Sequence, residues 1–363
     1  MKAVAVFPGS QQVKLIEQDV PRLTQPDQVV LRLLDVGICG TDKEICSFEY
    51  GTPPPGDDHL VIGHESLAEI VQVGSAVERF EVGDLVVPSV RRPCPHPGCL
   101  ACRSGHQDYC YVVDHERYMN LVPPDLREIA VLAEPLTIAE KALEQIFWMM
   151  QDRPPWLDPQ TPSHERGRGL SALVLGIGPV GLLGAMTLAT AGFTTYVYSR
   201  ELPPSPRIDL VNAIGATYVS SQTATFPDLA AQIGNIDLVY EAVGHSHFAL
   251  QALQVLGTNG IFVLTGVPGL QAFVETDPAR TMREMVLKNR VLLGTVNAGP
   301  EAFASALRDL DVFRRRWPAV VRTLIAGRYP PEQAPDLILG RPAGIKSVIT
   351  FDAPVAGQSS GPR

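Results

Sequence analysis

The sequence lacks any long uninterrupted hydrophobic run, and it has no cysteine after residue 110. Its longest apolar stretch, LVLGIGPVGLLGAMTLATAGF, is broken by glycine and proline and does not predict a membrane span. Basic residues are also fewer than acidic ones, with 30 Lys and Arg against 39 Asp and Glu and a net charge of −9. An acidic surface argues against non-specific binding to nucleic acid or to an anionic membrane. The sequence therefore predicts a globular protein with neither as a partner.

The N-terminus lacks the layout of a secretory signal, since the apolar run in MKAVAVFPGS is too short. We therefore expect a cytoplasmic protein. Thiols stay reduced in that compartment, and clustered cysteines there indicate bound metal rather than disulfides. All six cysteines lie between Cys39 and Cys110, so the metal chemistry is expected in this part of the chain.

One Pro/Gly-rich stretch, PCPHPGCLACRSGHQDYC, holds four of these cysteines: Cys94, Cys99, Cys102 and Cys110. Four thiolates without an open position predict a structural zinc that holds together a lobe at about residues 94–110. Two disulfides or unrelated core cysteines are the alternatives, and a reducing compartment disfavours both. His96 and His106 lie within the stretch, but four thiolates already complete a zinc site, so we expect both histidines at the surface.

The segments GICGTD and IGHES predict a second metal site, because they contain Cys39, His64 and Glu65. A thiolate, an imidazole and a carboxylate are zinc ligands, and three ligands leave a position open for substrate. On spacing alone this set is weak, because a single cysteine on an apolar strand is more often a core residue. Cys46 stands outside both groups and is expected to be a plain thiol.

The chain reads as an α/β protein of two domains. Short apolar strands separated by turns make the first part β-rich, and PLTIAEKALEQIFWMMQ has helical spacing. From residue 170, strands alternate with helices, as in a doubly wound parallel sheet. We expect domains at residues 1–165 and 166–297, with 298–363 returning to the first domain. Within that last part, residues 301–328 are predicted helical and SVITF is predicted to be a strand.

A glycine-rich turn follows the strand ALVL and opens a helix. Its residues are Gly176, Ile177, Gly178, Pro179, Val180 and Gly181. A packing turn is the alternative, but the strand before it and the helix after it favour dinucleotide binding. The first glycine permits the tight turn, the second lets the backbone approach a pyrophosphate, and the third lets helix and strand pack closely.

The second strand of this region ends at Ser199 and Arg200, where an NAD site would place an acidic residue on the ribose hydroxyl. A hydroxyl and a guanidinium suit a 2′-phosphate instead, so the sequence favours NADP. Glu201 follows directly and leaves NAD possible, and Arg207 is a weaker second candidate. A solvated loop charge is the alternative interpretation of Arg200.

GICGTD, IGHE, the four-cysteine stretch, LAEP and GIGPVG occur in this order along nearly the whole chain. In this the chain resembles the zinc-dependent medium-chain alcohol dehydrogenases, most of all the archaeal-type glucose (aldose) 1-dehydrogenases. The resemblance implies a GroES-like catalytic domain beside a Rossmann domain. It also implies hydride transfer from C1 of an aldose to NADP or NAD, two zinc ions per chain, and a homodimer or homotetramer.

Roles for individual residues follow from the same resemblance. Cys39, His64 and, in some states, Glu65 correspond to ligands of the catalytic zinc, and Glu134 matches a further position near that metal. One of the two glutamates is expected to exchange for water or substrate, because zinc with Cys39 and both carboxylates would be net negative. Thr41 matches the hydroxyl that relays the substrate proton. Asn297 matches a residue near nicotinamide and substrate, although a turn-forming asparagine is the alternative.

Two departures from the family bear on the substrate. The family carries a longer segment after the last cysteine that helps line the sugar pocket, but here Cys110 runs directly into YVVDHERY, and Glu116 belongs to the later strand. Val90 stands before Arg91 and Arg92, where an asparagine that binds sugar hydroxyls is expected. These departures keep two alternatives open. One is a dehydrogenase of another polyol or secondary alcohol, of the sorbitol or threonine type. The other is a catalytically weak zinc- and nucleotide-binding relative.

Overall fold

The computed structural model describes residues 1–90, 94, 96–110, 119–156, 162, 165–268, 275–340 and 342–351. The chain divides into two compact units, the first comprising residues 1–90, 116–134 and 322–363 and the second residues 91–115 and 135–321. In this division the four-cysteine stretch belongs to the second unit, where Asp108 pairs with Lys141. The predicted domain boundaries at residues 165 and 297 stay predictions.

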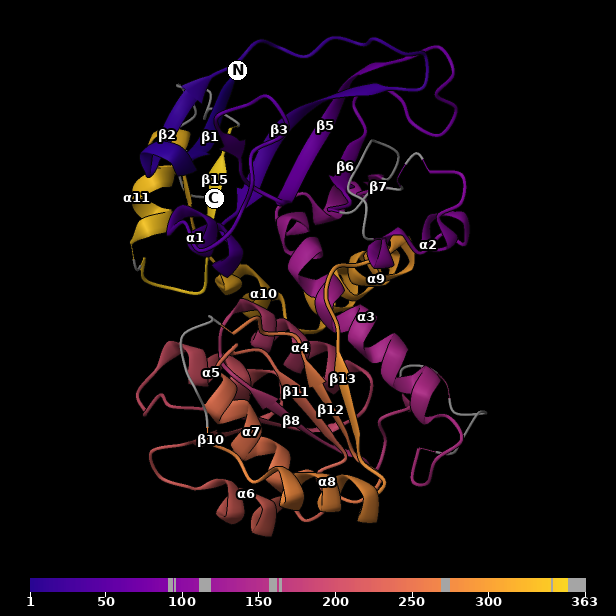
Figure 1. Ribbon diagram of the computed structural model, residues 1–363, viewed down its shortest axis with the longest axis vertical. Coiled ribbons are helices and arrows are strands. Elements are labelled where there is room, and N and C mark those ends of the chain that lie inside the picture. The colour runs from indigo at the N-terminus through magenta and orange to yellow at the C-terminus, as the bar shows by residue number, and fades with distance from the viewer. Residues whose placement is uncertain are drawn as a thin grey trace, which may run out of the picture. The chain divides into compact units, whose positions relative to one another are not determined.

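The first unit is β-rich, as predicted, and contains two sheets (Figure 1). A three-stranded sheet has the order β2-β1-β4 and consists of β1 (Lys2–Phe7), β2 (Gln12–Glu17) and β4 (Leu60–Val61). A six-stranded sheet has the order β14-β15-β3-β5-β6-β7 and consists of β3 (Val29–Gly37), β5 (Glu65–Val73), β6 (Leu85–Pro88), β7 (Met119–Leu121), β14 (Ile325–Tyr329) and β15 (Lys346–Thr350). The helices α1 (Gly40–Cys46) and α11 (Ala334–Leu339) pack together in this unit.

The predicted helix over residues 301–328 is wrong at its C-terminal end. Helices α9 (Pro300–Arg316) and α10 (Pro318–Leu324) account for most of it, but β14 begins at Ile325. The residues of β14 alternate between half-buried and exposed, and they pair in parallel with β15. A five-residue segment of this kind takes its conformation from the sheet edge beside it, which the local sequence does not reveal.

The second unit contains a parallel six-stranded sheet with the order β10-β9-β8-β11-β12-β13. Its strands are β8 (Ser171–Leu175), β9 (Thr194–Ser199), β10 (Thr217–Ser220), β11 (Leu238–Glu241), β12 (Ile261–Leu264) and β13 (Val291–Gly294). In order along the chain this is the 3-2-1-4-5-6 arrangement of the doubly wound nucleotide-binding fold. The predicted Rossmann fold is confirmed, and its switch point lies between β8 and β11.

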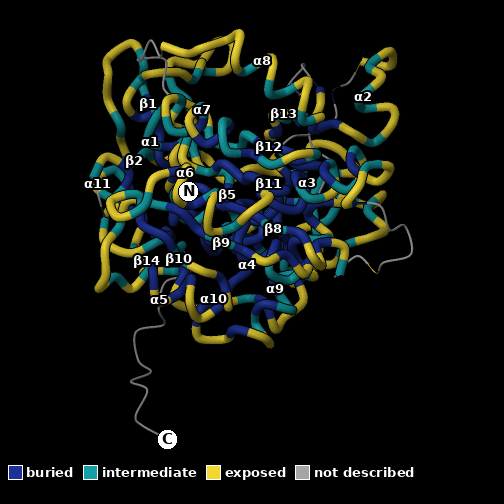
Figure 2. Tube along the Cα trace, turned by 90° about the horizontal axis from the view of Figure 1, so that it is seen from below, coloured by how far each residue is buried: buried dark blue, intermediate teal, exposed yellow. Residues whose placement is uncertain are grey.

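Helices connect and cover these strands (Figure 1). They are α4 (Pro179–Thr190), α5 (Pro206–Ala213), α6 (Phe226–Ile233), α7 (Ser246–Val255) and α8 (Pro278–Leu287). Side chains of α6 and α7, such as Leu229 and Leu253, pack on Val239 and Phe262 of the sheet in one buried cluster. In Figure 2 the tube is dark blue through β8 and β11, in agreement with the buried residues of both strands. This buried core fixes the positions of the carboxyl ends of the strands, where a nucleotide would bind.

Two further helices complete the second unit, α3 (Ala133–Met150), which begins in the first unit, and α2 (Leu100–Arg103). No helix among the described residues is long and apolar enough to cross a bilayer. Three residues named in the sequence analysis lie outside the described residues, namely Arg91, Arg92 and Glu116.

Candidate active site

The open metal site is assembled in the first unit by the ends of two strands. Cys39 follows β3 and is the N-cap residue of α1, while His64 and Glu65 stand where β5 begins. One ligand atom from each residue lies within 4.8 Å of the others. The three residues predicted from the sequence therefore come together, although Cys39 lies at a helix N-terminus rather than within an apolar strand.

Asp42 orients two of these ligands. Its Oδ2 accepts a hydrogen bond from the Cys39 backbone N–H at 2.8 Å, and its Oδ1 lies 3.5 Å from His64 Nδ1. A carboxylate beside one ring nitrogen leaves Nε2 to bind a metal and fixes the orientation of the ring. Since Asp42 is buried, solvent does not compete for this carboxylate.

Lys346 is the first residue of β15 and forms an ion pair with Glu65, and the sequence analysis missed it. Its Nζ lies 2.6 Å from both carboxylate oxygens of Glu65 and donates a further hydrogen bond to the Ile38 carbonyl at 3.1 Å. Burial lowers the pKa of Lys346, but the charges of Glu65 and Cys39 outweigh this and raise it. Gly37 leaves room for the pair, since a Cβ there would lie 2.1 Å from Glu65 Oε2. The only sequence signal for Lys346 is one charge at the start of an apolar strand.

The electrostatics of the site suit a cation. Burial lowers the pKa of His64, but hydrogen bonds with Asp42 and Cys39 raise it to about 12. Without a metal, the His64 imidazole is therefore protonated. Burial and the charge of Glu65 raise the pKa of Glu134 to about 7. A divalent cation would replace that proton and compensate the anionic groups, and thiolate, imidazole and carboxylate are zinc donors. The residues present therefore fit zinc.

The raised pKa of Glu134 predicts a pH-dependent stability of the zinc-free protein. Below pH 4.5 this carboxyl is protonated in both folded and unfolded chains, and between 4.5 and about 7 the folded chain binds more protons. The free energy of unfolding therefore falls as the pH rises through this window. The total loss is about 3 kcal/mol, because each unit of difference between the folded and unfolded pKa corresponds to about 1.36 kcal/mol. We expect Glu134→Gln to remove that loss, so that the thermal midpoint of the zinc-free variant increasingly exceeds the wild-type midpoint from pH 5 to 8.

Glu78→Gln is the control for this measurement, because Glu78 is an exposed carboxylate of the same unit. An unchanged difference in midpoint between Glu134→Gln and wild type across this pH range would show that Glu134 titrates as an ordinary carboxyl.

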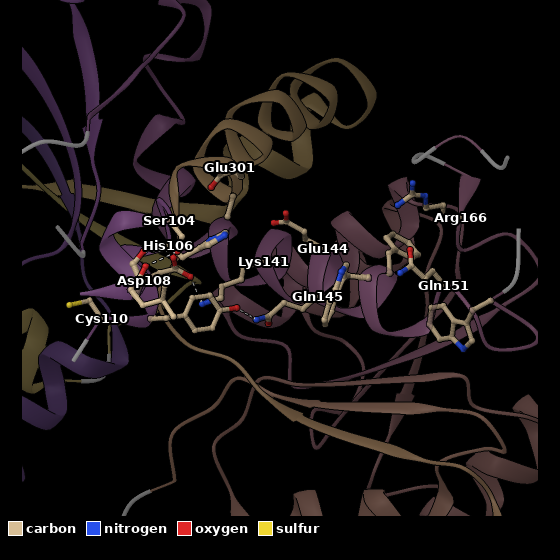
Figure 3. Close-up of a pocket in the computed structure, with 18 of the residues that line it drawn as sticks. Ser104, His106, Asp108, Cys110, Lys141, Glu144, Gln145, Gln151, Arg166 and Glu301 are labelled. Atoms are coloured by element: carbon tan, nitrogen blue, oxygen red, sulfur yellow. Dashed lines mark hydrogen bonds and ion pairs between the residues drawn. The ribbon is translucent and has the colours of Figure 1, made fainter. Parts of the chain in front are cut away.

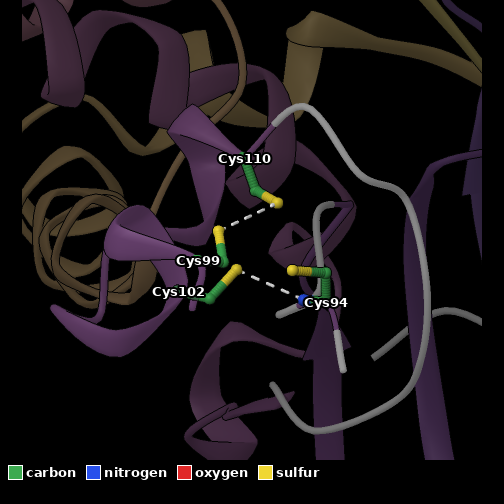
Figure 4. A group of neighbouring side chains, drawn as sticks. All are labelled: Cys94, Cys99, Cys102 and Cys110. Atoms are coloured by element: carbon green, nitrogen blue, oxygen red, sulfur yellow. Dashed lines mark hydrogen bonds between the residues drawn. The ribbon is translucent and has the colours of Figure 1, made fainter. Parts of the chain in front are cut away.

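The four-thiolate site lies in the second unit and is built from α2 and the 3₁₀ turn η2 (Gln107–Tyr109) (Figure 4). The ligand sulfurs of Cys94, Cys99, Cys102 and Cys110 lie within 4.8 Å of one another, and all four cysteines are free. Both histidines of the stretch are exposed and stand outside the group. Cys46 is also outside it, buried in the core of the first unit.

The geometry of the four sulfurs fits zinc rather than disulfides. Cys99 Sγ and Cys110 Sγ are 3.7 Å apart, whereas a disulfide bond measures about 2.05 Å. Tetrahedral zinc with Zn–S bonds of about 2.3 Å places its sulfurs about 3.8 Å apart. A backbone hydrogen bond from Cys102 and the neighbouring thiols lower the pKa of Cys99 to about 7, while burial raises the pKa of Cys102 to about 12. The Cys99 thiolate therefore forms readily, whereas the Cys102 thiolate needs a cation beside it.

The glycine-rich turn stands at the switch point of the parallel sheet. Gly176 has φ +105°, which favours glycine, and a Cβ at Gly181 would lie 2.4 Å from the Gly176 carbonyl oxygen. Gly178 caps α4 and faces open space, so its backbone is accessible to a ligand. Pro179 and Val180 are the first residues of α4, whose N-terminal N–H groups favour an anion. The three glycines have the geometry that a pyrophosphate requires.

Glu241, which the sequence analysis also missed, shapes the other side of the switch point. This buried last residue of β11 accepts backbone hydrogen bonds from Val243 at 2.7 Å and Gly244 at 2.8 Å. The next loop approaches so closely that a Cβ at Gly266 would lie 2.2 Å from the Gly244 nitrogen. The carboxylate thus holds the loop beside the Gly176 turn in one conformation.

The end of β9 carries the two residues predicted for the phosphate contact. Ser199 is the last residue of the strand and Arg200 is exposed after it. The carboxylate of Glu201 lies 3.2 Å from Arg207 Nη1 and also accepts a hydrogen bond from Ser205. Glu201 is therefore engaged with its own neighbours, while no ion pair in the described part of the chain engages Arg200. This arrangement leaves a guanidinium available at the position where a 2′-phosphate would lie.

The remaining predicted residues occupy both units. Thr41 lies half-buried on α1, and the half-buried Asn297 follows β13 with φ +57°. Val90 is 37% exposed at the last described position before the four-cysteine stretch. A cavity of about 1690 Å³ runs along α3 in the second unit, past Tyr109, Trp148 and Trp156, and it does not include the Cys39 group (Figure 3).

Two family models match the chain. The description "Alcohol dehydrogenase GroES-like domain" matches residues 25–144, and "Glucose dehydrogenase C-terminus" matches residues 127–351. The two matches together span both units. The predicted GroES-like domain is confirmed by the first of them.

Curated relatives and solved structures agree with these matches. Glucose 1-dehydrogenase of Methanocella arvoryzae is 33% identical, over 97% of this chain and 100% of that protein. Glucose 1-dehydrogenase 2 of Vulcanisaeta moutnovskia is 36% identical, over 89% of this chain and 92% of that protein. Glucose dehydrogenase of Haloferax mediterranei, in complex with NADP, Zn and gluconolactone, has 32% identity and a TM-score of 0.83, covering 97% of this chain and 99% of that one.

Proposed function

Since the chain belongs to the glucose dehydrogenase family of zinc-dependent medium-chain alcohol dehydrogenases, we propose that it oxidises glucose at C1 to the lactone with NADP. The chain is an NAD(P)-dependent zinc oxidoreductase. The observation that carries the proposal is the open Cys39–His64–Glu65 group in the same chain as a Rossmann turn of the required geometry. The aldose as substrate is supported by the Haloferax structure, which contains gluconolactone.

We assign the two metal sites different roles. Cys94, Cys99, Cys102 and Cys110 would hold the structural zinc, while Cys39, His64 and Glu65, with Glu134 beside them, would hold the catalytic zinc. When bound, the catalytic zinc acts as a Lewis acid that lowers the pKa of the substrate hydroxyl. Two zinc ions per chain is the stoichiometry that this assignment predicts.

The charges around the open site favour Glu134 as the carboxylate that exchanges for water or substrate. Lys346 is hydrogen-bonded to both oxygens of Glu65 and compensates its negative charge. Glu134 lies near these charges, and burial together with the charge of Glu65 raises its pKa to about 7, which supports a less well compensated ionised form. A carboxylate that takes up a proton near neutral pH leaves a metal more readily than one fixed by a buried ammonium.

The proton and the hydride leave the substrate in different directions. Thr41 lies two residues after Cys39, and its side chain interacts with the phenol of Tyr50, which is 49% exposed. We assign Thr41 to accept the substrate hydroxyl proton and pass it toward the exposed phenol. The C1 hydrogen leaves as hydride to the nicotinamide, so that one alcohol and one NADP⁺ give the lactone, NADPH and a proton.

A substrate panel of aldoses, polyols, amino alcohols and simple alcohols, with NADP and NAD, tests the proposed reaction by the appearance of reduced nicotinamide. Glucose with NADP should give the highest kcat/KM. Activity with a polyol but with no aldose would instead support the sorbitol- or threonine-type alternative, which the apolar Val90 favours. Failure to turn over any alcohol, despite two bound zinc ions, would support the catalytically weak relative.

Cofactor preference is expected to depend on Arg200. Replacement by aspartate removes the guanidinium and places a carboxylate where the 2′-phosphate would lie. Loss of a hydrogen bond to a charged group is worth about 1.5–3 kcal/mol, so kcat/KM for NADP should fall about tenfold to a hundredfold while NAD is retained. Steady-state kinetics with both nucleotides measure the change. Arg168→Asp, an exposed arginine elsewhere in the second unit, is the control, and an unaltered preference in Arg200→Asp would contradict the assignment.

A homodimer or homotetramer is also proposed, and it is supported by an apolar surface on the second unit. β13 is an edge strand of the sheet, and exposed apolar side chains lie on this strand, after it and on α8: Leu292, Val296, Met282, Val286 and Leu287. Unpaired apolar strand edges invite association with another chain. Light scattering gives the mass in solution, and a monomer at every concentration would contradict the proposal.

A further inference from the structure

A buried lysine that neither metal site uses joins three segments of the second unit. Lys141 of α3 is 5% exposed, and its Nζ lies 2.7 Å from Asp108 Oδ2 and 4.1 Å from the centre of the Tyr109 ring. The same ammonium donates a hydrogen bond to the Val296 carbonyl at 3.0 Å. Figure 3 shows Lys141 pointing from its helix toward Asp108. A buried charge requires such partners, and here they come from the four-cysteine lobe and from the loop after β13.

On the lobe side, the contact depends on the chain between two metal ligands. Asp108 lies in η2, two residues before Cys110, so the arrangement of the thiolates determines where its carboxylate stands. Its second oxygen, Oδ1, is buried and accepts no hydrogen bond from the described part of the chain. The carboxylate also lies against the start of α9, where a Cβ at Gly299 would be 3.0 Å from Oδ1. The lobe and this loop are therefore in direct contact.

In the loop after β13, Lys141 contacts the carbonyl of Val296, the residue before Asn297. The φ of +57° at Asn297 is a left-handed conformation that a non-glycine residue adopts at a free-energy cost unless its surroundings fix it. The Lys141 hydrogen bond to the preceding carbonyl is one interaction that fixes it. The loop leaves the carboxyl end of a parallel strand, which is the edge at which a dinucleotide binds in this fold.

We propose that Lys141 is a positioning residue that couples the four-cysteine lobe to the Asn297 loop, so that an intact lobe strengthens binding of the nicotinamide nucleotide. This inference rests on the proposed function, because it takes Asn297 to lie beside the nicotinamide. It gives the lobe a role beyond stability: Asp108 holds the ammonium, the ammonium holds the Val296 carbonyl, and the carbonyl sets the conformation of Asn297.

The test is the dissociation constant for NADPH, measured by nucleotide fluorescence on the full-length, zinc-loaded protein. Lys141→Met alone leaves Asp108 as a buried unpaired charge, so it is combined with Asp108→Asn, because removing both charges of a buried pair is often close to neutral for stability. This double variant keeps the volume of both side chains but lacks the donor to Val296. We expect NADPH to bind about tenfold more weakly, in line with the loss of one charge-assisted hydrogen bond.

Kinetics separate positioning from a purely structural role. A structural defect would reduce the fraction of active protein and lower kcat, whereas mispositioning of Asn297 should raise KM for NADP about tenfold with kcat at saturating NADP changed less. Lys288→Met, which removes a half-buried lysine of the same unit that pairs with Glu284, should leave both constants unchanged. NADPH binding as tight in the double variant as in wild type would overturn the inference. Wild-type protein that binds no nicotinamide nucleotide would overturn the proposed function and the inference with it.

Coupling to the lobe is tested by a double-mutant cycle with Cys102→Ser, scored on folded protein whose zinc content has been measured. If the lobe acts through Lys141, the cysteine change should weaken NADPH binding in wild type but add little in the Lys141→Met, Asp108→Asn background. Independent effects that multiply would contradict coupling. Should Cys102→Ser not fold, the binding constant of the Lys141→Met, Asp108→Asn variant still decides the inference.

Discussion

His64→Ala is expected to remove one of two zinc ions and to lower kcat/KM for glucose by at least about a thousandfold. His64 is central to the open site, since its ring lies among Cys39, Glu65 and Asp42. A Lewis-acid metal contributes several kcal/mol to a transition state with developing charge, and each 1.36 kcal/mol is a factor of ten. Metal analysis by mass spectrometry and steady-state kinetics on the same preparation measure both losses.

His59→Ala is the matched control, because His59 lies nearby in sequence but stacks on Phe7 and stands outside the metal group. This control should keep two zinc ions and wild-type kinetics. The zinc that remains in His64→Ala should be the one bound by the four thiolates, which are located in the other unit. Undiminished turnover with one zinc per chain would show that the Cys39 group does not hold the catalytic metal.

Lys346→Met should destabilise the protein by about 3–5 kcal/mol, the cost of leaving one member of a buried ion pair uncompensated. The ammonium is 2% exposed and lies 2.6 Å from Glu65, whose side chain is 1% exposed. The loss should be larger in the zinc-free protein, because bound zinc would itself compensate Glu65. Urea unfolding with and without zinc measures the effect as a shift of the midpoint, since a chain of two units need not unfold in one step.

The Glu65→Gln, Lys346→Met double variant removes the charge of both partners. Its midpoint in zinc-free protein should recover toward the wild-type value, because a neutral pair no longer requires a buried counter-charge. Lys43→Met serves as the control, since Lys43 is a half-buried lysine of the same unit that donates to a backbone carbonyl. Equal destabilisation by the single and double changes would show that packing of the lysine stem, rather than charge, is responsible.

The local features of both sites could be predicted from the sequence because neighbouring residues create them. The four cysteines lie in one short stretch, and residues 94–110 bring their sulfurs together with two turns. The glycine turn follows a buried strand and opens a helix, so its conformation depends on adjacent residues. The apolar periodicity likewise predicted the parallel sheet, which hydrophobic burial then assembles.

The residues that support these sites could not be predicted in the same way. Lys346 is 281 residues from Glu65 along the chain, and Lys141 is 155 residues from Val296. In the sequence, a lysine that will be buried is only a single charge among apolar residues, whether or not the fold gives it an acidic partner. β14 was mistaken for the end of a helix for a related reason, since its parallel neighbour β15 follows only after α11 and is not part of the local sequence.

The sequence by itself determined the family, the two groups of proposed metal ligands and the glycine-rich turn, because each depends on residue types at short spacing. Only the tertiary structure decided which charged side chains pair with the buried charges at these sites. β15 and β5 both pair with β3, and this places Lys346 against Glu65. The doubly wound sheet and the lobe together place Lys141 between Asp108 and Val296. The physical reason is that a buried charge must find its partner in space, and the packing of distant strands and helices selects that partner.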